Sequence, residues 1–272
     1  MNSPGLVVFS DLDGTLLDHA TYGFDAARPA LEALAALRVP LVFCSSKTRA
    51  EIEALRGAFG NHDPFVSENG SGIFIPRGYF PFRIPEARDL AGYSVVELGT
   101  RYEILRAAFQ RMRTEGNIPM RGFGDMNTDE IARLCGYSKE QAEPARRREY
   151  DEPFILNDPA GEDTVRRMAA EAGLRIDRGG RFFHLTGPSD KGRAVRMLIE
   201  WFVRDRGPTT TVGIGDSLND LPMLRVVDVP VLVARPGGVH DPAVQFDGLV
   251  LEKGVGPEGW RAAVLEILSR RP

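Results

Sequence analysis

LVVFSDLDGT, residues 6–15, joins an apolar run to two aspartates and a glycine. The apolar part, Leu6 to Ser10, predicts a short buried strand, and Gly14 permits a tight turn after it. Because residues two apart in an extended chain point to the same side, Asp11 and Asp13 can present two carboxylates together. The stretch therefore predicts a strand that ends in a pair of acids, at the edge where open α/β folds bind their ligands.

Strand-like and helix-like segments alternate along the chain after this stretch. Such alternation predicts an α/β fold with a Rossmann-like core, in which helices cover both faces of a parallel sheet. Leucines 31, 34 and 37 recur at helical spacing, and a further helix is expected over Thr48 to Phe59. The other expected strands of the core are Val39 to Cys44, Thr210 to Gly215 and Val229 to Val233.

The order of expected strands and helices changes between about Phe82 and Pro188, where we expect an inserted α/β domain. Two of its helix starts have capping-box spacing, Asn127 with Glu130 and Ser138 with Gln141, and Gly136 is placed to end the first of these helices. A strand over Ser94 to Leu98 and a helix over Arg101 to Glu115 are expected before them, and a helix from about Asp190 to Asp205 after them. The predicted domains are therefore a core of residues 1–82 and 189–272 and an insert of residues 83–188.

The composition favours a small-molecule substrate. The chain has 272 residues and a net charge of -4, so neither nucleic acid nor an anionic membrane is an expected partner. No apolar run approaches the roughly 20 residues of a membrane span, and no signal peptide is recognisable, so a cytoplasmic location is expected. Cys44 and Cys135 are interpreted as structural thiols. The sequence does not indicate an oligomeric state.

Two carboxylates alone would repel a phosphate dianion, so a phosphate-handling site here needs a divalent cation such as Mg²⁺, which prefers oxygen ligands. The run GIGDSLND, residues 213–220, supplies more acids after another buried strand. A helix cap would explain either Ser217 or Asp216. It would not explain a cluster that also contains Asp220.

Ser45 and Ser46 follow a predicted strand, and Lys47 comes next. A hydroxyl beside helix-start amides makes a seat for phosphate, although the two serines could simply cap the helix. Lys191 opens a predicted helix, where it is either a solvated lysine or a cation that neutralises Asp11 and phosphoryl oxygens.

These stretches resemble, in the required order, the four motifs of the haloacid dehalogenase superfamily of phosphohydrolases. That resemblance implies that Asp11 attacks phosphorus and forms an aspartyl-phosphate, while Asp13 acts as acid and then base. Ser45, Lys191 and Mg²⁺ would hold the phosphoryl oxygens. The implied metal ligands are the side chains of Asp11 and Asp216 and the backbone carbonyl of Asp13, with Asp220 supporting the metal through water or hydrogen bonds. The insert resembles the α/β cap of the sugar-phosphate branch.

Five further runs resemble the mannosyl-3-phosphoglycerate phosphatase family: FCSSKT at 43–48, ENG at 68–70, GFGDM at 122–126, REYDEPF at 148–154 and RFFHL at 181–185. The resemblance implies hydrolysis of mannosyl-3-phosphoglycerate, and of its glucosyl counterpart, to a glycosylglycerate and phosphate in compatible-solute synthesis. Many relatives carry Thr-Gly-Arg where this chain has Ser45, Ser46 and Lys47, which we interpret as a subfamily mark.

A glycerate carboxylate and a hexose require a cation and several hydrogen-bonding groups. Arg148 and His184 also have purely structural interpretations, as a helix-end cation and a strand histidine. The expected substrate-binding residues are Ser46, Lys47, Glu68, Asn69, Asp125, Arg148 and His184.

Three other functions remain open at this point. The same fold could act on another sugar phosphate, such as sucrose phosphate or a hexose phosphate. A phosphomutase would use the same aspartyl-phosphate but return the phosphoryl group to a sugar. A silent phosphate-binding module is disfavoured by the full set of carboxylates, hydroxyl and lysine.

Overall fold

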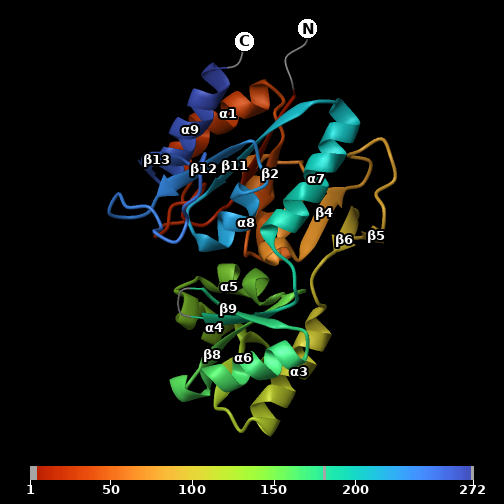
Figure 1. The fold of residues 1–272 in the computed structure, drawn as a ribbon, viewed down its shortest axis with the longest axis vertical. Helices are drawn as coiled ribbons and strands as arrows, with labels where there is room; N and C mark the ends of the chain where they lie inside the picture. Colours follow the sequence, from red (N-terminus) through yellow and green to blue (C-terminus); the bar gives the residue numbers. More distant parts are fainter. Residues whose placement is uncertain (1–4, 180–181, 271–272) are drawn as a thin grey trace. The chain divides into compact units, whose positions relative to one another are not determined.

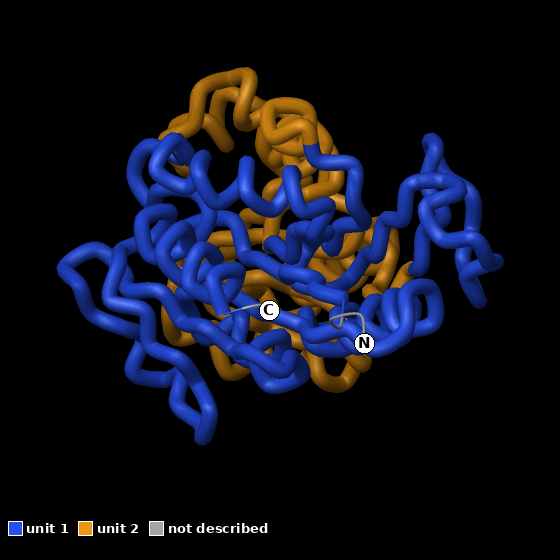
Figure 2. The backbone as a smooth tube through the Cα atoms, turned by 90° about the horizontal axis from the view of Figure 1, so that it is seen from above, with its two compact units in different colours: residues 1–45, 61–96, 190–272 blue, residues 46–60, 97–189 orange. Residues whose placement is uncertain are grey.

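The computed structural model of the chain describes residues 5–179 and 182–270. The chain divides into two compact units, which have different colours in Figure 2. Unit 1 comprises Met1–Ser45, Asn61–Val96 and Asp190–Pro272, and unit 2 comprises Ser46–Gly60 and Glu97–Ser189. Both units are therefore assembled from segments that are distant in sequence.

Unit 1 is built on a sheet whose described strands follow the order β13-β12-β11-β1-β2-β3-β4-β6-β5. The pairs from β13 to β3 are parallel, whereas β3 with β4 and β5 with β6 are antiparallel. This mainly parallel sheet confirms the predicted α/β core. The strand bounds are β1 Gly5–Ser10, β2 Leu41–Cys44, β3 Phe65–Ser67, β4 Gly72–Pro76, β5 Arg88–Leu90, β6 Tyr93–Glu97, β11 Thr209–Gly215, β12 Val229–Ala234 and β13 Val250–Val255.

Helices cover both faces of this sheet. Phe9 of β1 packs edge-on against Phe202 of α7, whereas the next residue, Ser10, accepts a hydrogen bond from Trp260 of α9. Because neighbours along a strand point to opposite faces, α7 and α9 lie on opposite sides of the sheet. Helix α1 packs beside α9, as Figure 1 shows, and α8 packs with α7. The bounds are α1 Arg28–Ala36, α7 Lys191–Arg206, α8 Leu221–Leu224 and α9 Pro257–Ser269, with short 3-10 helices at Asp25–Ala27, Glu68–Gly70 and Leu218–Asp220.

Unit 2 is built on an antiparallel sheet with the order β7-β8-β10-β9 among its described strands. One face packs a core cluster of side chains from α3 and α6, and the other packs a smaller cluster under α4 and α5. This separate small sheet with its helices agrees with the predicted α/β insert. The bounds are α2 Arg49–Phe59, α3 Tyr102–Glu115, β7 Met120–Gly122, α4 Thr128–Cys135, α5 Lys139–Arg146, β8 Asp151–Leu156, α6 Glu162–Glu171, β9 Arg175–Gly179 and β10 Phe182–Thr186, with 3-10 helices at Phe123–Asp125 and Pro159–Gly161.

The local signals of unit 2 are largely confirmed. Asn127 and Ser138 form the expected capping boxes, and Gly136 ends α4 in the left-handed conformation. Residues 88–97 extend the sheet of unit 1 as β5 and β6, although we expected the insert to begin at residue 83. Among the described residues, no helix is both long enough and apolar enough to cross a bilayer.

Candidate active site

Three polar side chains follow three neighbouring strands of the unit 1 sheet. Asp11 follows β1, Ser45 follows β2 and Asp216 follows β11, and β1 pairs in parallel with both of the others. Because parallel strands end at the same edge, these residues are brought together although they are far apart in sequence. The sequence prediction of a common sheet edge is confirmed.

Lys191, the first residue of α7, joins two of the acids. Its Nζ donates to Oδ1 of Asp11 and to Oδ1 of Asp220, each at 2.6 Å. The Lys191 side chain is 0% exposed, as is that of Asp220. The lysine is therefore an internal counter-ion for two carboxylates, and the interpretation of a solvated surface lysine is wrong.

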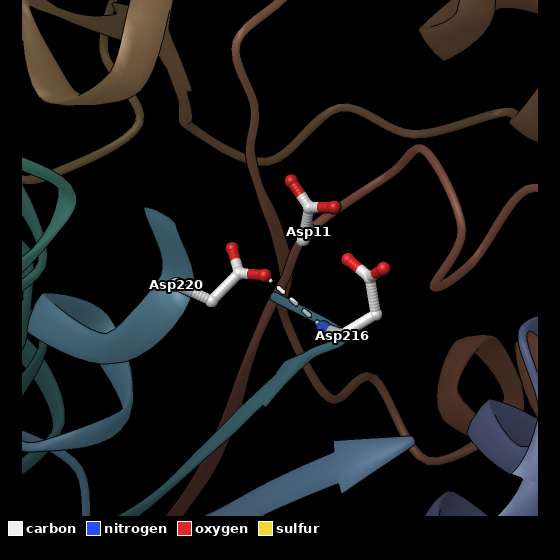
Figure 3. Close-up of side chains that lie close together, drawn as sticks. All are labelled: Asp11, Asp216 and Asp220. Atoms are coloured by element: carbon white, nitrogen blue, oxygen red, sulfur yellow. Dashed lines mark hydrogen bonds between the residues drawn. The ribbon is translucent and has the colours of Figure 1, made fainter. Parts of the chain in front are cut away.

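Asp220 is held at both of its carboxylate oxygens. Oδ2 accepts hydrogen bonds from the backbone amides of Asp216 and Ser217, each at 3.1 Å, while Oδ1 accepts from Lys191. Figure 3 shows the Asp216 contact beside the three converging side chains. Asp220 thus fixes both the loop that carries Asp216 and the ammonium that contacts Asp11, and it acts on the site through those neighbours.

Two glycines permit close approach around these residues. Gly14 has a φ of +76°, and a Cβ there would lie 3.0 Å from Oδ2 of Asp216. Gly70 has a φ of +98°, and its Cβ would lie 2.1 Å from the Asp190 carbonyl oxygen, next to Lys191. A side chain at Gly70 would collide with the backbone, and one at Gly14 would press on the Asp216 carboxylate. The positive φ disfavours a side chain at both positions.

The electrostatics of the cluster reflect an excess of acid. Burial, reinforced by Asp220 and Asp216, raises the pKa of Asp11 well above its usual value despite the contact with Lys191. Burial also raises the pKa of Asp216, together with Asp220 and against the nearby Arg235. Burial lowers the pKa of Lys191, but the two carboxylates outweigh that effect and raise it overall. Folding thus concentrates negative charge that one lysine does not neutralise.

A divalent cation fits this arrangement. Asp11, Asp216 and Asp220 each offer a carboxylate oxygen, and these atoms lie within 4.8 Å of one another. Hard cations such as Mg²⁺ favour oxygen ligands, and a cation would relieve the repulsion that raises the carboxyl pKa values. The chemistry of the residues therefore suits the metal that the sequence predicts.

Asp13 and Ser45 complete the predicted catalytic set. Asp13 forms an isolated bridge with Leu17 in the turn after β1, so its backbone is fixed near the acids. Ser45 is fully buried, and its backbone bonds to Val66 and Asn69. Helix α2 is capped by Thr48, so capping does not account for Ser45 or Ser46.

The turn at Glu68 and Asn69 joins the same region of unit 1. Both residues adopt positive φ, at +46° and +56°. Such a conformation is strained for side chains other than glycine and is found where the surroundings enforce it. Glu68 is 1% exposed, and Asn69 accepts a weak hydrogen bond of 3.4 Å from Asn219 of the Asp216 loop. This turn is therefore linked to the acidic loop.

Two features of the site were missed at the sequence level. Arg235, which follows β12, contacts Asp216 at 3.3 Å and Asp241 at 2.9 Å. Its place after a parallel strand is the signal that would have found it. Trp260 donates to Ser10, whose hydroxyl donates in turn to the Asp11 carbonyl at 2.7 Å. No local sequence pattern links α9 to β1.

The remaining candidates lie in unit 2, where Arg148 and His184 come together on Asp151. His184 Nδ1 lies 2.8 Å from Oδ2 of Asp151, and Arg148 reaches the same oxygen at 3.4 Å. Arg148 also donates to the carbonyl of Ser46 at 3.2 Å. Arg148 and His184 are therefore joined through one carboxylate that the sequence analysis had not selected, and Arg148 links this pair to Ser46.

Lys47 and Asp125 have other partners in unit 2. Lys47 is buried beside Glu51 at 3.7 Å. Asp125 accepts from Arg106 at 2.5 Å and from Arg113 at 3.0 Å, both on α3. These contacts commit the Asp125 carboxylate to two guanidinium groups, apart from the contacts made by Asp151.

The comparisons with known proteins agree with this geometry. A family model for haloacid dehalogenase-like hydrolases matches residues 8–79, which contain Asp11 and Ser45. A glucosyl-3-phosphoglycerate/mannosyl-3-phosphoglycerate phosphatase from Methanococcoides burtonii is 41% identical over 265 residues, 97% of each chain. The chain belongs to this phosphatase family. The resemblance inferred from the motifs is thereby confirmed.

Two more relatives support the family and the fold. A mannosyl-3-phosphoglycerate phosphatase from Pyrococcus horikoshii is 36% identical over 227 residues, 84% of this chain and 90% of the relative. A solved sugar phosphatase of haloacid dehalogenase subclass IIB aligns over 96% of this chain and 98% of its own, with a TM-score of 0.64 and 17% identity. The second likeness shows the fold: a mainly parallel core sheet with a smaller inserted sheet.

Proposed function

We propose that the protein is a Mg²⁺-dependent phosphatase that hydrolyses mannosyl-3-phosphoglycerate, and also glucosyl-3-phosphoglycerate, to the glycosylglycerate and phosphate. The observation that carries the chemistry is Lys191, fully buried between Asp11 and Asp220 beside Asp216. The substrate assignment is supported by the relatives, since two of them are named for these glycosylated phosphates. A cytoplasmic location and a role in compatible-solute synthesis belong to the same proposal.

The contacts of Asp11 support its role as nucleophile. Lys191 engages Oδ1 of Asp11, which leaves Oδ2 as the attacking oxygen. Oδ2 would form a bond to phosphorus as the bond from phosphorus to the glycerate oxygen breaks, giving an aspartyl-phosphate. Asp13 would protonate the leaving oxygen and then take a proton from the water that hydrolyses the intermediate.

The other residues of unit 1 would stabilise charge during transfer. Lys191 and Ser45 would donate hydrogen bonds to the phosphoryl oxygens. Asp11, Asp216 and the Asp13 carbonyl would hold Mg²⁺, and Asp220 would keep Lys191 and the Asp216 loop in place. When bound, Mg²⁺ supplies positive charge that offsets the charge of the phosphoryl group.

We further propose that the insert predicted at residues 83–188, apart from the β5 and β6 residues that pair in the unit 1 sheet, acts as a cap that sets substrate specificity. The catalytic core would then be unit 1, which was predicted at residues 1–82 and 189–272. Arg148 and His184, joined through Asp151, would bind the glycosylglycerate part of the substrate. The other residues proposed to contact substrate are Ser46, Lys47, Glu68, Asn69 and Asp125.

Phosphate release from mannosyl-3-phosphoglycerate, glucosyl-3-phosphoglycerate and plain hexose phosphates tests the proposal, measured with Mg²⁺ and with a chelator. We expect preference for the two glycosylated substrates and loss of release with chelator. Preference for hexose phosphates would overturn the substrate assignment. Isomerised sugar phosphate without free phosphate would indicate a phosphomutase.

A further inference from the structure

One face of the unit 2 sheet is half apolar and half polar. Alternation along β8 and β10 places Ile155 and Phe182 on this face, where they pack against the cluster under α4. The same alternation places Asp151, His184 and Thr186 at the other end of the face. An apolar half beneath a helix is ordinary core, whereas a polar half needs partners for its oxygen and nitrogen atoms.

Two oxygen atoms in the polar half have no hydrogen-bond partner among the described residues. They are Oδ1 of Asp151 and the hydroxyl oxygen of Thr186, and both are buried. Asp151 is 1% exposed and Thr186 is 6% exposed. A buried carboxylate oxygen and a buried hydroxyl without partners are costly, so such atoms in a native protein call for a partner.

The two atoms are close enough to share one partner. Asp151 and Thr186 are directly paired across β8 and β10. Directly opposed residues of an antiparallel pair have Cβ atoms about 5 Å apart and point to the same face. A single hydroxyl-sized group beside both side chains can therefore reach both atoms.

The chemistry of the pair selects a neutral hydroxyl group. A carboxylate oxygen only accepts hydrogen bonds, so the partner must donate to Asp151, while Thr186 can donate to that partner in return. A carboxylate or fully ionised phosphate of a ligand lacks the proton that Oδ1 of Asp151 requires. The positive charge of Arg148 is already shared with Asp151, at 3.4 Å, so this end of the face carries little net charge.

We propose that Asp151 and Thr186 form a subsite for one hydroxyl group of the sugar ring, which donates to Asp151 Oδ1 and accepts from the Thr186 hydroxyl. His184 and Arg148 hold the carboxylate by its other oxygen and so aim Oδ1 at the sugar. This inference rests on the proposed function, and it makes Thr186 a determinant of specificity for the glycosylated substrate.

The test compares Thr186→Val, which keeps the size of the side chain, with the wild type and with Thr186→Ser, which restores a hydroxyl. For mannosyl- and glucosyl-3-phosphoglycerate we expect the KM of Thr186→Val to rise about tenfold, as loss of one hydrogen bond implies. The KM for p-nitrophenyl phosphate should not change, and Thr186→Ser should recover most of the loss. Ile155→Val, on the apolar half of the same face, is the matched control and should leave every KM unchanged.

Deoxy analogues of the sugar ring sharpen the test. One analogue should bind the wild type about tenfold more weakly, yet lose little further affinity in Thr186→Val, because the two changes remove the same hydrogen bond. Should Thr186→Val not fold, Thr186→Ala removes the same hydroxyl and is interpreted in the same way.

An unchanged KM in Thr186→Val would overturn the inference, and a lowered Tm in the same variant would then assign the two oxygens to a buried water, because the variant loses a hydrogen bond to that water. A wild type that does not hydrolyse either glycosylated substrate would instead overturn the proposed function. The two failures are therefore distinguishable.

Discussion

Asp11 in unit 1 is buried and Asp125 in unit 2 is half-buried, but acidic groups predominate around the first and arginines around the second. Burial and two further acids raise the pKa of Asp11 against a single lysine. Burial also acts to raise the pKa of Asp125, but the hydrogen bond from Arg106 and the charge of Arg113 outweigh it, and the net pKa is lowered. Around Asp11 the carboxylates outnumber the positive charges, whereas around Asp125 two arginines of α3 supply enough positive charge.

The difference shows that the neighbours of an aspartate, more than its burial, decide what it can do. An aspartate that is repelled by neighbouring carboxylates suits a site that binds a cation together with a phosphoryl group. An acid neutralised by two guanidiniums is suited to hold a loop in place. Five substitutions or measurements test this comparison, and they are ordered by expected effect.

The largest effect is expected for Asp11→Asn, which removes the attacking oxygen but keeps the shape of the side chain. Phosphate release should fall by at least about 10⁴-fold, as for the loss of other catalytic nucleophiles. The measurement is the single-turnover rate with saturating Mg²⁺. Unimpaired release would remove Asp11 from the mechanism.

Lys191→Met should destabilise the protein by about 3–5 kcal/mol in the absence of Mg²⁺, because it leaves buried carboxylates without their counter-ion. The free energy of unfolding is measured in urea. Added Mg²⁺ should restore part of the loss, since it binds the folded state only. Lys139→Met is the matched control, because Lys139 is 71% exposed. Equal effects at the two lysines would contradict the structure.

Asp125→Asn should cost about 1–3 kcal/mol of stability, because Arg106 and Arg113 lose a charged acceptor. The lowered pKa of Asp125 also fixes the sign of a pH effect. Its stabilisation is present above the ordinary aspartate pKa and is lost as the pH falls through the lowered, folded value. Urea unfolding of both proteins between pH 7 and pH 3 measures this. A raised KM with unchanged stability would instead favour the proposed contact between Asp125 and substrate.

Mg²⁺ affinity should fall as the pH is lowered, because protons compete with the metal for Asp11 and Asp216. Since the pKa of each carboxyl is raised, the fall should begin at a higher pH than an ordinary aspartate would give. Each proton displaced contributes about a tenfold loss of affinity per pH unit. Calorimetric titration at several pH values gives the slope. Affinity that is constant down to pH 4 would contradict the raised pKa values.

The smallest effect is expected for Trp260→Phe, which keeps the ring but removes the N–H that reaches Ser10. Loss of this buried hydrogen bond should cost about 1 kcal/mol of stability. If the contact also positions Asp11, kcat should fall a few-fold with KM unchanged. Ser10→Ala should then add no further loss of kcat, whereas additive losses would show that the two residues act separately.

The alternation of strands and helices, the acids after Ser10 and Gly215 and the capping boxes of unit 2 were all predictable from sequence. Each depends on residues close together in the chain. The common edge of parallel strands then follows from the α/β fold itself, which is why Asp11, Ser45 and Asp216 could be grouped before the structure was known.

Other contacts depend on which strand pairs with which, and at what register. The placement of α2 in unit 2, the extension of the large sheet by β5 and β6, and the bond from Trp260 to Ser10 join segments with no local signal in common. For the same reason, the sequence named Arg148 and His184 but not Asp151, the residue that joins them.

The sequence by itself therefore determined the fold class and the reacting groups, because strand and helix periods and strand-end motifs are local properties of the chain. Only the tertiary structure decided the partners of each acid: Lys191 for Asp220, two arginines for Asp125, and the position opposite Thr186 for Asp151. The physical reason is that side-chain neighbours, and with them charge balance and pKa, are set by packing between segments that the chain brings together only when it folds.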